Sequence, residues 1–130
     1  MTKKKKKTIM TRLLREATKN KPVFRARVVA AVVYRGKIIA IGKNQNKTHP
    51  EAAKYCKHED AIFLHAEVDA INRAKKKMPC LSKTQIFVLR IRQDGTVGNS
   101  LPCLGCASCI EEHKVSQINY TNEEGELECI

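Results

Sequence analysis

Aromatic residues are scarce in this sequence: they make up 5% of it, and tryptophan is absent. Proteins that hold single-stranded nucleic acid usually stack successive bases on aromatic side chains, so an extended surface of that kind is not expected. Long apolar segments are also lacking. The longest uninterrupted apolar run is Val28–Tyr34, much shorter than the ~20 residues that cross a bilayer, which argues against a membrane-spanning helix.

The N-terminus carries the basic run Lys3–Lys7 but not the roughly 7–15 apolar residues that a signal peptide places behind such charge. We therefore expect a soluble, cytoplasmic protein. In a reducing compartment, the six cysteines are expected to be free thiols or metal ligands rather than disulfides. Repeats and linkers are absent, so 130 residues predict one domain, residues 8–130, behind a disordered basic tail, residues 1–7.

Acidic residues are too few to balance the basic ones, and the formal net charge is +12. Such an excess favours phosphate-bearing partners, either free nucleotides or a polynucleotide backbone. A solvated surface that only keeps the protein soluble is the alternative. For Lys3–Lys7 both interpretations stay open.

Helical and strand-like segments alternate along the chain. Apolar spacing predicts helices over about 8–20, 66–77 and 102–114, and strands over 23–34, 37–42, 84–91, 115–121 and 127–130. Residues 93–100 resemble an inserted turn. Only about five residues join the last two strands, which is too few for a parallel crossover, so these strands should pair antiparallel. The order predicts an α/β fold with helices packed on the faces of a sheet.

Residues with metal-binding chemistry lie at the predicted starts of the second and third helices. His65-Ala66-Glu67 opens one, and Pro102-Cys103-Leu104-Gly105-Cys106 opens the other. One imidazole and two thiolates are a ligand set that Zn²⁺ prefers, and three protein ligands leave a fourth position for water, as in catalytic sites. One helical turn separates Cys103 from Cys106, at a helix N-terminus that favours thiolates.

Glu67 follows His65 by two residues, which places its carboxylate near the metal without making it a ligand. A carboxylate there can accept a proton from zinc-activated water and pass it on. Taken alone, His65 is better interpreted as a core histidine and Glu67 as a charge that suits the helix dipole; the Pro-Cys-x-x-Cys motif reverses that preference. We interpret Cys109, Cys80 and Cys129 as packing residues.

The two motifs and their order resemble the cytidine and deoxycytidylate deaminase superfamily over about residues 23–130. The resemblance implies a three-layer α/β/α cytidine-deaminase-like fold with a mixed five-stranded sheet, and the short final connection makes the last two strands of this sheet antiparallel. It implies zinc held by His65, Cys103 and Cys106, and Glu67 as the catalytic residue. Three substrate contacts are also implied: Asn44 to the sugar, and the backbone of Ala66 and Leu101 to the base edge.

Features of different subfamilies coexist in this chain. His-Ala-Glu resembles the nucleotide enzymes, whereas the antiparallel ending resembles the nucleoside enzymes, which usually carry Asn-x-Glu where this chain has Asn44-Gln45-Asn46. Lys43 and Lys47 lie where a 5′-phosphate could reach. We expect hydrolytic deamination of a cytosine-containing nucleotide or nucleoside by a homo-oligomer, with deoxycytidine monophosphate (dCMP) preferred. The alternative is a polynucleotide cytosine deaminase or a nucleic-acid-binding deaminase-like module.

A second, structural zinc occurs in some deoxycytidylate deaminases. His49, Cys56 and His58 offer ligands for one here, but their spacing matches no standard pattern. A loop without metal is the preferred interpretation.

Overall fold

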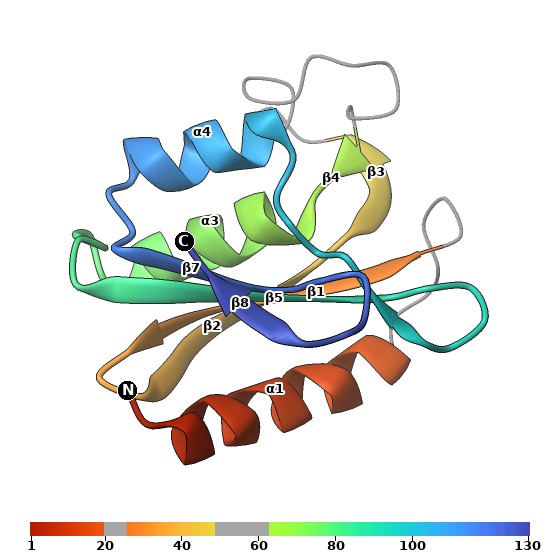
Figure 1. The fold of residues 1–130 in the computed structure, drawn as a ribbon. Coiled ribbons are helices and arrows are strands. Elements are labelled where there is room, and N and C mark those ends of the chain that lie inside the picture. Colours follow the sequence, from red (N-terminus) through yellow and green to blue (C-terminus); the bar gives the residue numbers. More distant parts are fainter. Residues whose placement is uncertain (20–25, 49–62) are drawn as a thin grey trace.

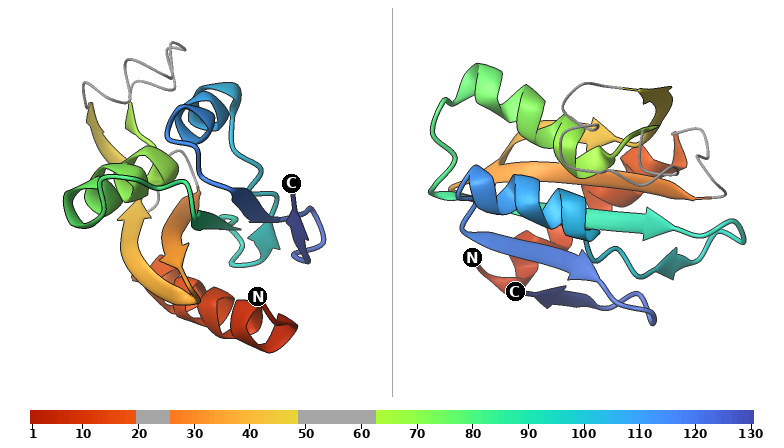
Figure 2. Two further views of the ribbon diagram at one scale, coloured as in Figure 1. Left: turned by 90° about the vertical axis from the view of Figure 1, so that its left-hand side faces the viewer. Right: turned by 90° about the horizontal axis from the view of Figure 1, so that it is seen from above.

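A mixed β-sheet forms the middle layer of the protein, with helices on both faces (Figure 1 and Figure 2). The computed structural model describes residues 1–19, 26–48 and 63–130. Helix α1 (Lys3–Thr18) covers one face, and helices α3 (Ala66–Lys77) and α4 (Leu104–Glu112) cover the other. This is the expected three-layer α/β/α arrangement.

Five strands form the main path of the sheet in the order β2-β1-β5-β7-β8. Their bounds are β1 (Arg27–Tyr34), β2 (Lys37–Lys43), β5 (Thr84–Ile91), β7 (Gln117–Thr121) and β8 (Leu127–Cys129). Strand β1 is antiparallel to both β2 and β5, and β5 is parallel to β7. Strands β7 and β8 are antiparallel, which confirms the expectation drawn from their short connection.

The strand count differs from the expected five. Strand β6 (Val97–Gly98) pairs with the end of β5 and makes the sheet six-stranded. It lies in the segment interpreted as an inserted turn, which folds back because the N–H of Arg92 donates to the carbonyl of Thr96 at 2.8 Å. Strands β3 (Gln45–Thr48) and β4 (Phe63–Leu64) form a separate two-stranded sheet.

Helix α1 begins at Lys3, so the expected disordered tail over residues 1–7 is wrong: residues 3–7 form the first turns of the helix. The Thr2 side chain caps it by accepting the N–H of Lys5 at 3.1 Å. Lysine is a good helix former, and the run continues a helix already held on the sheet by Ile9, Leu13 and Ala17. Among the described residues, no helix is long and apolar enough to span a membrane.

Strand β1 separates two apolar cores, because successive side chains of a strand point to opposite faces. Val29, Ala31 and Val33 pack toward α1, whereas Ala30 and Val32 pack toward α3 and α4. Strand β5 contributes to both cores in the same way. Burial on both faces explains the continuous apolar runs of these two strands, Val28–Tyr34 in β1 and Ile86–Leu89 in β5.

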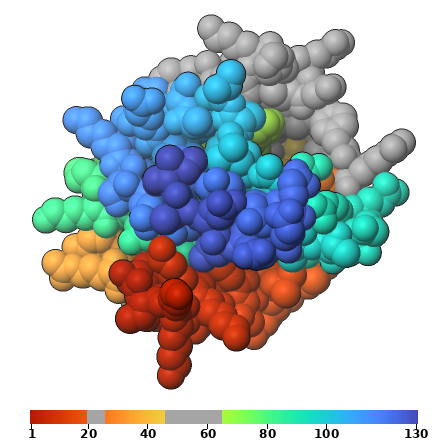
Figure 3. Space-filling model, viewed as in Figure 1, coloured from red at the N-terminus to blue at the C-terminus, as the bar shows by residue number. Residues whose placement is uncertain are grey.

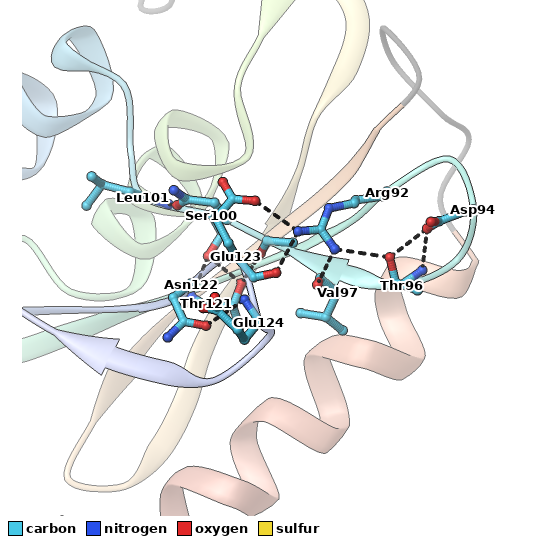
Figure 4. Close-up of polar contacts among 12 residues, drawn as sticks. Arg92, Asp94, Thr96, Val97, Ser100, Leu101, Thr121, Asn122, Glu123 and Glu124 are labelled. Atoms are coloured by element: carbon cyan, nitrogen blue, oxygen red, sulfur yellow. Dashed lines mark hydrogen bonds and ion pairs between the residues drawn. The ribbon is translucent and has the colours of Figure 1, made fainter.

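The segment that leads from β5 into α4 is tied to the turn after β7 (Figure 4). The Arg92 guanidinium donates to the Glu123 carbonyl at 2.6 Å and lies 3.0 Å from the Glu123 carboxylate. The buried Ser100 hydroxyl donates to the carbonyl of Val88 and accepts the N–H of Thr121, both at 2.7 Å. These bonds fix the chain just before the start of α4.

Candidate functional site

The starts of α3 and α4 bring the three predicted metal ligands together. His65 is the N-cap residue of α3, Cys103 is that of α4, and Cys106 lies in the first turn of α4. His65 Nδ1 lies 3.2 Å from Cys106 Sγ, and 3.7 Å from Cys103 Sγ although 38 residues separate the two in sequence. Within the three described ranges, no other group of three or more potential metal-binding side chains lies this close together.

These separations fit a tetrahedral zinc site. All three ligand atoms lie within 4.8 Å of one another. Bonds of about 2.0–2.3 Å from zinc to nitrogen and sulfur place neighbouring tetrahedral ligands roughly 3.5 Å apart. The donor set and its spacing therefore suit the metal without rearrangement of the helices.

The low pKa of the Cys103 thiol also suits a metal. The hydrogen bond with the Cys106 side chain, followed by that with His65, lowers the pKa of Cys103 to about 3. The thiolate is the form that binds zinc. Cys106 is buried, whereas Cys103 is exposed and His65 half-buried, so the cluster opens to solvent on one side and a substrate can approach it.

Glu67 lies in the first turn of α3, two residues beyond the imidazole ligand, and only 6% of it is exposed. Burial raises the pKa of Glu67, because desolvation disfavours the charged carboxylate. A carboxyl group with a raised pKa holds a proton more readily than a solvent-exposed one, which suits a group that takes up and releases protons. Its environment is thus suited to the proton transfer expected from the motif.

Gly42, near the end of β2, allows α3 to approach the sheet closely. A Cβ atom at this position would lie 2.4 Å from the carbonyl oxygen of Ala66 and 2.3 Å from the nitrogen of Ala70. Both atoms belong to the helix backbone, so no side-chain rotation relieves the clash. A glycine within a strand often marks a place where another part of the backbone approaches closely. The glycine inside the predicted strand 37–42 was therefore the sequence signal for this contact.

Asp69 fastens the same helix to the end of β2. It is 7% exposed and accepts the backbone N–H of Lys43 at 3.1 Å, the Gln45 amide at 3.3 Å and the Arg73 Nε–H at 3.1 Å. A carboxylate in the first turn of a helix also interacts favourably with the helix dipole. Asp69 therefore helps to position the turn that carries Glu67.

Replacement of Gly42 by alanine should lower both the melting temperature and the zinc content. The added methyl would push α3 and its ligand away from α4, and overpacking typically costs about 1–3 kcal/mol. Thermal denaturation and elemental analysis would measure the two effects. Gly98→Ala is the control, because the three atoms nearest to the added methyl belong to the Arg92 side chain and not to the backbone of a helix that carries a predicted ligand. Equal losses in both variants would contradict this account of Gly42.

The Lys43 side chain does not lie where the sequence led us to expect. Its Nζ is 3.2 Å from Glu16 Oε2 of α1, whereas Gly42 faces α3. Neighbouring strand residues point to opposite faces, so Lys43 is directed away from the zinc ligands. The expectation that it contacts a 5′-phosphate is wrong for this arrangement, and the Lys47 side chain lies outside the described part.

The side chain of Asn44 forms hydrogen bonds with the backbone at the start of β1. Its Oδ1 accepts the N–H of Val28 at 3.0 Å, and its amide donates to the carbonyl of Ala26 at 3.4 Å. These bonds fix the orientation of the amide. Its contact with a substrate sugar stays a prediction.

Ala66 follows the predicted ligand His65 directly, and Leu101 lies two residues before the predicted ligand Cys103; the two differ in exposure. Ala66 is buried at the start of α3, whereas 49% of Leu101 is exposed. The N–H of Leu101 donates to Asn99 Oδ1 at 2.8 Å. Base recognition by these two backbones also stays a prediction.

The other cysteines follow the predictions only in part. Cys109 is buried, as expected. Cys80 and Cys129 are exposed, so their expected packing role is wrong: the first follows the end of α3, and the second lies on the edge strand β8. The candidates for a second zinc, His49, Cys56 and His58, lie outside the described residues.

Solved structures with the same fold include two deaminases. The apo dCMP deaminase of the cyanophage S-TIM5 superposes with a TM-score of 0.67 at 24% identity, covering 95% of this chain and 86% of that one. The cytidine deaminase of Burkholderia pseudomallei gives a TM-score of 0.62 at 20% identity, covering 92% and 90%. At these identities the likeness shows the fold.

Comparison of the sequence with known protein families identifies the family of this chain. No curated protein matches the chain significantly. Residues 3–122, however, match the family described as the cytidine and deoxycytidylate deaminase zinc-binding region. Because that match spans both helix starts that carry the donor atoms, the chain belongs to the cytidine and deoxycytidylate deaminase family, and its metal is zinc.

Proposed function

We propose that the protein catalyses the hydrolytic deamination of a cytosine-containing nucleotide or nucleoside, with dCMP as the first candidate. The observation that carries the proposal is the buried carboxyl group of Glu67 beside a zinc ligand set that is open to solvent. Two findings support it: the family match, and the same fold in the S-TIM5 dCMP deaminase solved in complex with dCMP and dUMP.

The reaction replaces an amino group by an oxygen. The oxygen of a water molecule forms a bond to C4 of the base, the C4–N bond breaks, and ammonia leaves. Zinc held by His65, Cys103 and Cys106 supplies, when bound, the Lewis acidity that makes water a nucleophile at neutral pH. The chain's own residues hold the base and move the protons.

Glu67 is the proton carrier of this proposal. Its carboxylate accepts a proton from the attacking water, delivers it to N3 of the ring, and assists protonation of the departing amine. Burial raises the pKa of Glu67, which favours uptake of the proton by its carboxylate.

Substrate orientation rests on three further residues. The Asn44 amide, held by the start of β1, contacts the sugar. The backbone of Ala66 and that of Leu101 bind opposite parts of the base edge. The first N–H groups of a helix make no bond within it, so the start of α3 has donors to offer.

A panel of substrates tests this function. Zinc-loaded full-length protein is assayed for ammonia release from cytidine, deoxycytidine, their monophosphates, adenosine, guanine, and single-stranded DNA and RNA. We expect the cytosine-containing small molecules to react, and dCMP fastest. No release from any of them would contradict the function.

Salt separates the proposed function from the alternative suggested by the net charge of +12. Binding of a strand weakens with salt in proportion to the number of phosphates neutralised, whereas a monophosphate engages few charges. Much faster deamination of DNA or RNA, with a steep salt dependence, would show that the substrate class is a polynucleotide.

A further inference from the structure

A hollow lies on the opposite face of the sheet from the zinc ligands. It has a volume of about 570 Å³ and is bounded by α1 and by strands β7 and β8. Figure 3 shows the surface where α1 (red) meets the C-terminal strands (blue). Small-molecule sites typically occupy about 300–1,000 Å³, so this groove is large enough for a ligand.

One flank of α1 forms a wall of the groove. Lys3, Lys7, Met10 and Leu14 line it and recur at helical spacing, so they share one side of the helix. They are distinct from the buried residues by which α1 packs on the sheet. Leu14 is 40% exposed. The wall is therefore apolar toward the middle of the helix and positively charged toward its start.

The sheet supplies a floor of mixed character. Leu89 and Leu127 give it an apolar part, and both pack in the core beneath α1. Asn119 of β7 gives it a polar part. Its partners in the ladder are Phe87 on β5 and Cys129 on β8, so it takes a position where the apolar core would otherwise continue.

Asn119 leaves a hydrogen-bond acceptor without a partner. The residue is fully buried, and its amide donates to Gln85 Oε1 at 3.2 Å and to the carbonyl of Ile86 at 3.5 Å. Among the buried side-chain nitrogen and oxygen atoms of the described residues, Asn119 Oδ1 is the one that lacks a hydrogen-bond partner. A buried polar group left unpaired is unfavourable, and it calls for an explanation such as a ligand.

We propose that this groove is a second binding site, for a small amphipathic anion. Its apolar or aromatic body lies on Met10, Leu14 and Leu127. A hydrogen-bond donor at its buried end points to Asn119 Oδ1, and an acidic group reaches Lys3 and Lys7. The groove lies across the sheet from the zinc ligands, so a molecule bound there does not contact them.

Charge favours such a ligand over a second copy of the chain as the occupant. The groove is lined by three lysines of α1 and by one acidic residue, Glu128. A self-complementary contact through this groove would bring two sets of lysines toward each other, which is unfavourable. A small anion is attracted by the same charges.

The dye 1-anilinonaphthalene-8-sulfonate is a suitable probe, because it combines an aromatic body, an N–H donor and a sulfonate. Titrated into zinc-loaded full-length protein at low salt and followed by fluorescence, it should bind saturably at one dye per chain. Lys3→Glu with Lys7→Glu should weaken binding at least about tenfold through lost attraction and added repulsion. Acidic residues suit the first turns of a helix, so α1 should persist.

Two comparisons make the result specific. Lys75→Glu with Lys76→Glu at the end of α3 changes the net charge equally and, with circular dichroism showing that α3 is retained, should leave dye affinity within about twofold. Leu14→Trp should fill the groove and abolish binding while circular dichroism shows an unchanged fold. Absence of saturable binding, equal weakening by both charge variants, or full binding to the Leu14→Trp protein would overturn the proposal. A dimer in sedimentation that Leu14→Trp dissociates would assign the groove to a second copy instead.

Discussion

Glu67→Gln should lower kcat by about 10²–10⁴-fold, the usual contribution of a general acid–base group, while zinc content and melting temperature stay close to those of the unchanged protein. The amide keeps the size of the side chain but cannot accept and return a proton. Burial favours the uncharged form at this position, so an uncharged replacement should not disturb the fold. Ammonia release under saturating substrate, normalised to bound zinc, measures the effect.

Asp69→Asn is the matched control for this experiment. Asp69 is the other buried carboxylate of α3, and its oxygens bind Lys43, Gln45 and Arg73 rather than the zinc ligands. The amide retains an acceptor for the backbone N–H of Lys43, so turnover should fall much less than in the Glu67→Gln protein. A zinc-loaded Glu67→Gln protein with turnover within about tenfold of normal would exclude the proton-transfer role.

Cys103→Ala combined with Cys106→Ala should abolish stoichiometric zinc binding and, with it, activity. Two of three protein ligands disappear, and one imidazole cannot hold the metal against a chelator. Zinc bound to the native state also stabilises it, since a ligand that binds only the folded form shifts the folding equilibrium. We therefore expect a lower melting temperature in the double variant, and a smaller response to chelator than in the unchanged protein.

Cys109→Ala provides the comparison for the loss of zinc. Cys109 lies further along α4 and is buried. Its replacement tests whether the loss of any cysteine from this helix is enough to remove the zinc. Elemental analysis should find zinc retained in the Cys109 variant and absent from the double variant. Zinc that stays in the double variant would refute the ligand set, and zinc absent from the unchanged protein would refute the metal site itself.

Local chemistry accounts for what the sequence alone determined about this protein. The two helix starts, at residues 65–67 and 102–106, can be predicted from the sequence because capping, proline placement and metal-ligand spacing each involve only a few neighbouring residues. The antiparallel pairing of β7 and β8 was predictable for a similar reason: a short connection permits only that geometry. The donor set, the candidate proton carrier and the order of the three helices and the five strands of the main sheet path follow from such short-range rules, whereas the short strands β3, β4 and β6 were not predicted.

Long-range packing decided how the predicted ligands come together and how Gly42, Lys43 and Asn119 are placed. Insertion of β5 between β1 and β7 brings His65 to the cysteines of α4, although 38 residues separate it from Cys103. The need for glycine at position 42 exists only once α3 crosses β2 at backbone contact. The direction of Lys43 and the buried acceptor of Asn119 likewise depend on which sheet face each residue occupies. Nearest-neighbour sequence patterns do not carry these facts, because each depends on a partner distant in the chain and on the alternation of strand faces.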